Sequence, residues 1–335
     1  MERLFHYQIT ESQEGCTVRG YLRSLGYSRN LMLHLRQTPR GLLHNGEATY
    51  GSAVLRAGDT LDILLKEDPA ASQISPIPMK LQILYEDEDL LVLNKPADTP
   101  IHPSAGNHHN TLANGVAYYF QSKGESFVYR CINRLDRDTT GALILAKHAY
   151  GASLLSSAIQ RRQIHRTYLA LVEGSCPDQG IIRAPIARKP TSILEREVNA
   201  QTGAPACTHY ECLDRRNGLS LVQLRLETGR THQIRVHMLH LGYPLLGDYL
   251  YHPEYSRIHR VSLHSYQLIL STQSPAAPVP VRSCAGGLPD SLGDRSVRPT
   301  SLTRGDRIVL LSPGSSVSAP NGERQSLRCS HPWTR

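Results

Sequence analysis

Residues 132–146 read Ile132-Asn133-Arg134-Leu135-Asp136-Arg137-Asp138-Thr139-Thr140-Gly141-Ala142-Leu143-Ile144-Leu145-Ala146. A polar segment with two carboxylates and two arginines thus leads directly into an apolar run of strand length. A carboxylate between arginines is held ionised because the cations stabilise its charge, and an ionised carboxylate can act as a nucleophile. The alternative interpretation is a surface turn whose charges form ion pairs.

A second polar segment reads Glu227-Thr228-Gly229-Arg230-Thr231-His232-Gln233-Ile234-Arg235. Gly229 can adopt a positive φ, so the chain can turn there from a strand into a helix. Arg230 would lie at the start of that helix, where the dipole disfavours a cation. This position predicts an anionic partner nearby, and an ordinary amphipathic helix is the alternative.

Two further segments have unusual composition. Residues 93–103 contain three prolines and are interpreted as a rigid loop that follows a strand, with Lys95 directly before the first proline. Residues 165–174 form a predicted strand with Arg166 and Tyr168 on one face. Each segment could also be purely structural.

The pattern of strand-like runs with few helices predicts an α+β fold with a largely antiparallel mixed sheet. Composition divides the chain into residues 1–66, a proline-rich linker at 67–79, a main domain at 80–275 and a tail at 276–335. Only residues 148–163 and 230–241 are expected to be helical in the main domain. Residues 1–66 show a helix–helix–hairpin order that resembles the small alpha-L-type RNA-binding module.

The tail at 276–335 is predicted to be disordered or aberrant. Ser, Pro and Gly supply 23 of its 60 residues, and residues 308–311 form its only apolar run long enough to pack. Such a composition buries too little surface to offset the entropy of ordering.

The charge distribution favours a polyanionic partner. The net charge is +8, of which residues 80–275 carry +4 while residues 1–79 are neutral. Phosphate contacts dominate affinity for RNA, so this pattern suits RNA, although a generic basic protein is the alternative. The sequence has no apolar run of membrane-spanning length, no signal-peptide pattern and no paired cysteine spacing. We therefore expect a cytoplasmic monomer with no membrane partner.

The sequence contains no pattern that indicates a cofactor. A phosphate-cradling glycine loop, a dinucleotide fingerprint and a Ser-His-Asp arrangement are all missing, so no nucleotide cofactor is expected. His232, His237 and His240 are spaced by five and three residues, which does not place all three on one helical face. We therefore expect no metal site.

Taken in order, the four segments resemble the RluA/RluD-type family of RNA pseudouridine synthases over about residues 80–270. The specific features are Arg-Leu-Asp-x-x-Thr-Thr-Gly and Gly-Arg-Thr-His-Gln-Ile-Arg-Val-His. The resemblance implies a catalytic domain of pseudouridine synthase type and an isomerase that acts on a uridine flipped out of the RNA stack. The uracil would be re-attached to its ribose through carbon, without a metal, nucleotide or redox cofactor.

The resemblance also implies three catalytic residues. Asp136 matches the family's catalytic aspartate, and Tyr168 matches the tyrosine that packs against the target base. Arg230 matches the basic residue that pairs with the aspartate.

Four basic residues are expected to contact RNA. Arg134 matches an arginine that helps to hold the flipped-out site open, and Lys95 belongs to a lysine-proline pair near the cleft. Arg166 and Arg235 complete the group.

Two functions from other classes remain open on these residues. One is a non-catalytic RNA-binding protein that retains the synthase fold. The other is a nucleoside glycosidase, which usually needs two carboxylates and could use Asp138 as the second. Ribosomal RNA and transfer RNA are both possible substrates of a synthase.

Overall fold

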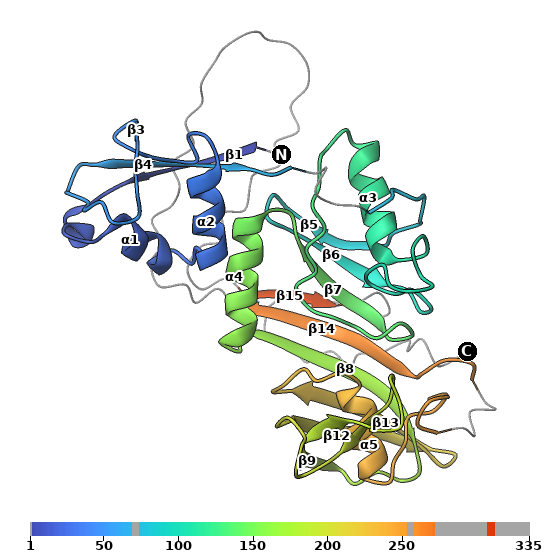
Figure 1. The fold of residues 1–335 in the computed structure, drawn as a ribbon. Coiled ribbons are helices and arrows are strands. Elements are labelled where there is room, and N and C mark those ends of the chain that lie inside the picture. Colours follow the sequence, from blue (N-terminus) through green and yellow to red (C-terminus); the bar gives the residue numbers. More distant parts are fainter. Residues whose placement is uncertain (1, 69–73, 253–257, 272–306, 312–335) are drawn as a thin grey trace, which may run out of the picture.

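The computed structural model describes residues 2–68, 74–252, 258–271 and 307–311. Its main sheet has nine strands: β5 (Ile83–Glu86), β6 (Leu90–Lys95), β7 (Thr140–Ala146), β8 (Ile164–Glu173), β9 (Gln179–Arg183), β12 (Cys207–Arg216), β13 (Leu219–Leu226), β14 (Leu263–Ser271) and β15 (Arg307–Leu311). Their order is β5-β6-β7-β14-β8-β13-β12-β9, with β15 also paired to β14 (Figure 1). Only the β7–β14 pair is parallel among the strand pairs of the described sheet. The predicted α+β fold with a largely antiparallel mixed sheet is confirmed.

Strand β14 joins the two halves of this sheet. It pairs in parallel with β7 through His264 and Ser265, and antiparallel with β8 along most of its length. Gly141 has a φ of 108°, and a Cβ there would lie 2.2 Å from the carbonyl oxygen of Ser265. Glycine is therefore required where β7 approaches β14.

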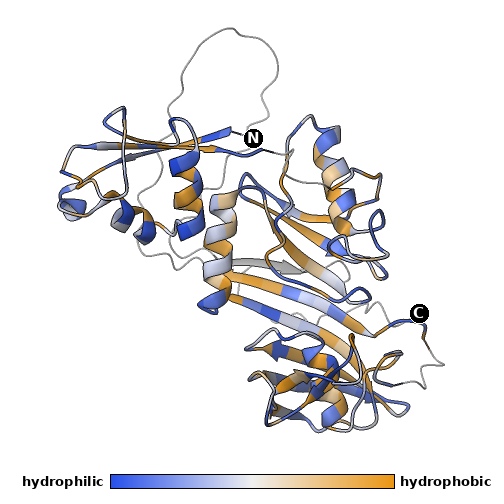
Figure 2. Ribbon diagram, viewed as in Figure 1, coloured by the Kyte–Doolittle hydropathy of each residue, from blue (hydrophilic) through white to orange (hydrophobic). Residues whose placement is uncertain are grey.

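The main apolar core lies on the faces of this sheet. Leu143 and Leu145 of β7 are fully buried and belong to one cluster with residues of β8 and β13. Figure 2 shows apolar colour concentrated along the central strands. This packed core supports the loops that carry the polar segments.

Three α-helices accompany the sheet: α3 (Leu112–Ser122), α4 (Ala149–Gln160) and α5 (Gln233–His240). The helices predicted at 148–163 and 230–241 are therefore confirmed, each slightly shorter than expected. Helix α3 corrects the expectation of only two helices in the main domain; it forms although Asn114 and Gly115 have low helix propensity. The Thr111 side chain caps this helix, and Asn114 completes the capping box.

A second sheet occurs near the N-terminus. It contains β1 (Glu2–Gln8), β4 (Thr60–Lys66), β2 (Leu42–His44) and β3 (Glu47–Ala48) in that order, with α1 (Val18–Ser24), α2 (Arg29–Gln37) and the short 3-10 helix η1 (Glu11–Gln13) beside it. Asn45 and Gly46 both have positive φ, as the predicted hairpin turn requires. The apolar residues of this part form their own cluster. The domain boundary at residue 66 and the resemblance to an alpha-L-type module both remain predictions.

The remaining described strands, β10 (Ile186–Arg188) and β11 (Arg196–Val198), pair with each other. The predicted tail at 276–335 lies outside the described residues except for β15, which coincides with its only long apolar run. Within the described part of the chain, no helix has the length and apolar character needed to cross a membrane.

Candidate active site

A cavity of about 540 Å³ is lined by the segment before β7 and by the segment that leads into α5. Strand β8 adds two side chains to its wall. Six candidate residues from the sequence line it: Arg134, Asp136, Arg166, Tyr168, Arg230 and Arg235. The structure thus brings together two polar segments that are far apart in the chain.

The loop that carries Asp136 is tied to the sheet. Asn133 is buried, and its Oδ1 accepts a hydrogen bond of 2.8 Å from the backbone nitrogen of Ile144 in β7. The backbone nitrogen of Thr139 donates to the carbonyl oxygen of Asp136 at 3.2 Å. These bonds fix the backbone on both sides of the carboxylate.

Lys95 supports the same loop from inside the protein. Its side chain is fully buried, and Nζ donates to the carbonyl oxygens of Pro96, Thr99 and Arg137 at 2.8, 2.9 and 2.7 Å. Burial lowers the pKa of Lys95 to about 8, despite the opposing charge of nearby carboxylates. The expectation that Lys95 contacts RNA is therefore wrong, because all three donors are used within the fold.

Arg235 lies between two carboxylates. Its Nε and Nη2 donate to Asp248 Oδ2 and Oδ1 at 2.7 and 2.6 Å, while Nη1 lies 3.6 Å from Asp136 Oδ2. The guanidinium also stacks on the Tyr251 ring, 4.9 Å from its centroid. Burial lowers the pKa of the Arg235 guanidinium, but the hydrogen bonds to Asp248 and the charges of Asp248 and Asp136 have a larger effect. The net result is a raised pKa.

This geometry corrects two sequence-based expectations. Arg235 is only 4% exposed, so it is an internal partner of Asp136 rather than a surface contact for RNA. Arg230 does not pair with Asp136. Helix α5 begins only at Gln233, so Arg230 lies in the preceding turn, where it is exposed and its Nε donates to the carbonyl oxygen of Pro205 at 3.1 Å.

His232 also lines the cavity, a position that its spacing to His237 and His240 does not predict. Its φ of 56° lies in the left-handed region, and Nε2 is 3.9 Å from Asp136 Oδ2. Nδ1 forms a 2.7 Å hydrogen bond with the Tyr251 hydroxyl. Burial lowers the pKa of His232, with the charge of Asp136 opposing this shift. The sequence signal that could have placed His232 in the cavity is its position in the same motif as Arg235.

The β8 side chains form another part of the wall. Tyr168 is buried, and burial raises the pKa of its hydroxyl while Arg166 opposes the shift. Arg166 is half-buried beside Gly229, where an added Cβ would lie 3.3 Å from Nη1. Arg134 and Arg230 are exposed where they line the cavity. The wall thus combines a buried aromatic ring with accessible cations.

Asp138 does not line the cavity. Its Oδ2 instead accepts a 3.1 Å hydrogen bond from the Tyr249 hydroxyl. A glycosidase needs two carboxylates that flank one bond, and the cavity offers Asp136 without Asp138.

Comparison with known proteins agrees with this site. The family described as RNA pseudouridylate synthase matches residues 89–240, which include both polar segments. A Bacillus subtilis relative, "Uncharacterized RNA pseudouridine synthase YjbO", is 40% identical over 253 residues, covering 75% of this chain and 89% of the relative. The chain belongs to the RluA/RluD-type family of RNA pseudouridine synthases. It is accordingly an RNA-modifying isomerase, and the non-catalytic alternative is not favoured.

Two further RNA pseudouridine synthase relatives extend the comparison. The Pasteurella multocida protein "Ribosomal large subunit pseudouridine synthase D" is 40% identical over 214 residues, covering 63% of this chain and 65% of that relative. The solved structure "Human RNA Pseudouridylate Synthase Domain Containing 1" is 28% identical, with a TM-score of 0.51 over 61% of this chain and 84% of that one. The fold of the described chain is therefore similar to that of the human domain.

Proposed function

We propose that this enzyme converts uridine to pseudouridine in RNA with Asp136 as the essential carboxylate. The observation that carries the proposal is the placement of Asp136 on the cavity wall, 3.6 Å from the guanidinium of Arg235. Arg235 is itself fixed by its two short bonds to Asp248. The carboxylate therefore faces a cation that cannot easily move away.

The cavity is suited to a single base and ribose. Its volume of about 540 Å³ lies within the range typical of small-molecule sites, and a uridine must leave the RNA stack to enter it. Asp136 begins the reaction as a nucleophile or as a base, and both routes start from its ionised form. Tyr168 would pack against the base while it detaches, rotates and rejoins the ribose through carbon.

The accessible arginines would hold the RNA backbone. Arg134 and Arg230 are exposed where they line the cavity, and Arg166 of β8 lines it half-buried. Guanidinium groups bind phosphate oxygens with two parallel hydrogen bonds. We propose that these three residues fix the strand on both sides of the target uridine.

Ribosomal RNA is the substrate that we propose. Several relatives about 40% identical to this chain are named large-subunit ribosomal pseudouridine synthases, and transfer RNA is the competing substrate. Pseudouridines would be mapped in ribosomal and transfer RNA from cells with the gene, without it, and with the Asp136→Asn variant. We expect one or more ribosomal positions to be lost without the gene and restored by the parent enzyme only. Loss confined to transfer RNA would overturn the choice of substrate, and restoration by the variant would overturn the role of Asp136.

A further inference from the structure

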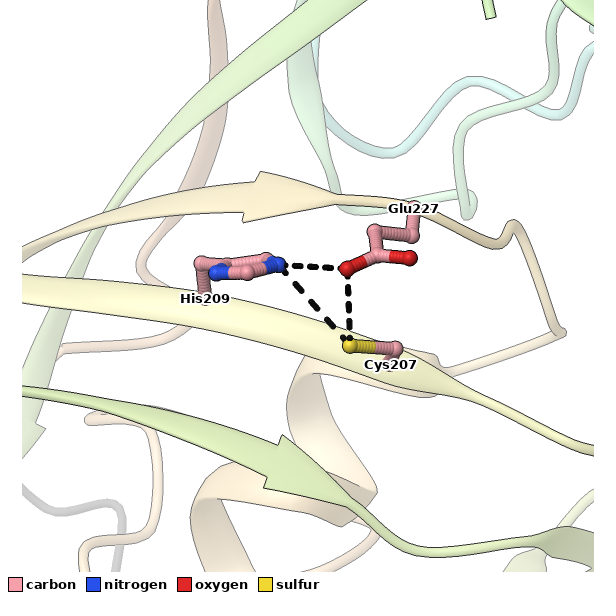
Figure 3. Close-up of side chains that lie close together, drawn as sticks. All are labelled: Cys207, His209 and Glu227. Atoms are coloured by element: carbon pink, nitrogen blue, oxygen red, sulfur yellow. Dashed lines mark hydrogen bonds and ion pairs between the residues drawn. The ribbon is translucent and has the colours of Figure 1, made fainter.

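Three side chains with metal-binding atoms meet outside the active-site cavity. Figure 3 shows Cys207 and His209 of β12 and Glu227, the residue after β13, pointing toward one another. Cys207 Sγ lies 3.9 Å from His209 Nε2 and 3.3 Å from Glu227 Oε1, and these last two atoms are 2.7 Å apart. They are the one such group of three found within the described part of the chain.

The strand register explains why these residues meet. Cys207 and His209 are two residues apart on β12, so their side chains share one face of the sheet. Thr208 pairs with Leu226 at the end of β13, and the next residue, Glu227, donates its backbone hydrogen to the carbonyl oxygen of Cys207 at 3.2 Å. The cluster thus depends on antiparallel pairing of residues that lie in separate sequence segments.

We propose that Cys207, His209 and Glu227 form a binding site for a divalent transition-metal ion of the zinc type. A thiolate, an imidazole nitrogen and a carboxylate oxygen are the ligand types that zinc takes in proteins, and a thiolate disfavours magnesium and calcium. Ligand atoms around tetrahedral zinc lie about 3.3 to 3.8 Å apart, given the usual bond lengths. Both distances from Cys207 nearly meet this spacing, and the His209–Glu227 contact needs to widen by roughly half an ångström.

The charge of the three side chains and their exposure to solvent also suit a divalent ion. An ionised thiolate and carboxylate supply two negative charges, which match a divalent cation. Arg162 Nη1 pairs with Glu227 Oε2 at 3.1 Å, so it fixes the carboxylate while Oε1 faces the other two ligands. The side chains of His209 and Glu227 are 37% and 32% exposed, which leaves the fourth position open to water.

The site is connected to the active site through the backbone of Cys207. The backbone nitrogen of Cys207 donates to Thr228 Oγ1, and its carbonyl oxygen accepts from Gln233 Nε2, both at 3.0 Å. Gln233 is the first residue of α5 and also binds the backbone nitrogen of Arg230. A bound ion would therefore stabilise the turn that leads to Arg235, without taking part in the isomerisation.

The site differs from the one that sequence spacing excluded. The excluded site would use histidines 232, 237 and 240 near one helix, whereas these ligands come from β12 and from the residue after β13. His237 is buried and bound to Thr208 and to the carbonyl oxygen of Ala184, so it is not available as a ligand.

Cobalt titration of the full-length protein, purified without a histidine tag and stripped with EDTA, tests the proposal. Co²⁺ bound to a thiolate gives a near-ultraviolet charge-transfer band, and tetrahedral coordination gives intense visible bands. We expect one equivalent of Co²⁺ to produce both, and Zn²⁺ to displace it. The melting temperature should rise with metal concentration, because an ion that binds only the folded state stabilises it.

Three variants and one control locate the ion. Cys207→Ser should abolish the charge-transfer band. His209→Gln and Glu227→Gln should each weaken Co²⁺ binding strongly. The loss should exceed the roughly 10–100-fold seen when a residue that only hydrogen-bonds to a metal ligand is removed. Cys212→Ser changes a thiol on the same strand and should leave the titration unchanged. Cys207 is buried, so the Cys207→Ser variant could fail to fold. His209 is half-exposed, and the His209→Gln variant then tests the site in its place. Absence of the band in the parent, or a parent-like titration of His209→Gln, would refute the site.

Discussion

Arg235 Nη1 lies 3.6 Å from Asp136 Oδ2, on the side of the guanidinium that Asp248 does not occupy. The two short bonds to Asp248 set the position of the cation, and the longer contact leaves the Asp136 oxygens accessible to a substrate. Each carboxylate therefore has a separate task. Asp248 orients the arginine, and Asp136 faces the cavity.

Replacement of Asp136 by asparagine should abolish pseudouridine formation. The amide keeps the size of the side chain but removes the negative charge that either proposed route needs. RNA binding should change little, because the exposed arginines remain. Pseudouridine formation in a single turnover and RNA affinity in a gel-shift assay measure the two effects. Turnover within about tenfold of the parent, far from the large losses seen for essential groups, would show that Asp136 is not essential.

Arg235→Lys should impair catalysis strongly. A lysine keeps the charge but cannot bind Asp248 through two parallel hydrogen bonds, so the cation moves relative to Asp136. A misplacement of about 1 Å costs on the order of 10²-fold in rate. Single-turnover rates at saturating RNA, together with urea unfolding, separate this loss from a loss of stability.

Arg230 provides the matched comparison for Arg235. Arg230→Lys should keep the single-turnover rate, because Arg230 lies outside the pair with Asp136. Arg230→Ala should weaken RNA binding and reduce the salt-dependence slope by about one unit, as expected for one lost phosphate contact. If Arg230→Lys lowers the rate as much as Arg235→Lys does, Arg230 rather than Arg235 acts on the carboxylate.

Lys95→Met should destabilise the protein without changing the salt dependence of RNA binding. The substitution leaves three carbonyl oxygens without their donor, and the buried one, on Thr99, alone costs about 1–3 kcal/mol when unsatisfied. Lys80→Met is the control, because Lys80 is exposed. Urea unfolding should show a loss of at least about 2 kcal/mol for the Lys95 variant only. Equal stability of the two variants would contradict the buried role of Lys95.

His264 should make the protein less stable in mild acid. Burial, with Arg260 adding to it, lowers the pKa of His264 from 6.5 to about 4. Between these pH values the unfolded chain therefore binds more protons than the folded protein does. The contribution of neutral His264 to the free energy of unfolding is complete above pH 6.5 and is lost as pH falls toward 4. At 1.36 kcal/mol per pKa unit, the loss is about 3 kcal/mol.

A comparison of variants isolates this contribution from those of other titrating groups. His264→Gln should show a shallower fall in the free energy of unfolding between pH 6.5 and 4 than the parent. His240→Gln, at an exposed position of α5, should keep the slope of the parent. If the free energy of unfolding of His264→Gln falls with pH as steeply as that of the parent, protonation of His264 does not contribute to the acid sensitivity.

The local pattern of the sequence was sufficient to predict the sheet class, two helices and most of the cavity wall. The segments around Asp136 and Arg235 carry strong composition signals, because each places several charges beside an apolar run. The resemblance assigned the pairing with Asp136 to Arg230, whereas the structure gives it to Arg235, five residues further along the same motif. The predicted helix start at residue 230 also lies three residues before the first residue of α5.

The remaining parts of the site depend on contacts that local sequence does not encode. Asp248 and Tyr251 lie in a turn beyond α5, and only packing shows that they hold Arg235 and His232. Lys95 was predicted to be near the cleft, but its side chain turns inward to bind two carbonyl oxygens of its own loop and that of Arg137 in a different loop. The start of α3 is set by Thr111 and Asn114, whose side chains cap the helix even though Asn114 and Gly115 disfavour helix.

The position of β14 affects when the enzyme can become active during its synthesis. Strands β5 to β7 support Asp136, and strands β8 to β13 lead to Arg235, but the two groups become one sheet only when Leu263–Ser271 lies between them. A nascent chain that has left the ribosome only as far as α5 contains both polar segments but lacks the strand that joins their supports. The enzyme would therefore become active only after this late strand has been translated, because Asp136 and Arg235 are held together only when the sheet is complete.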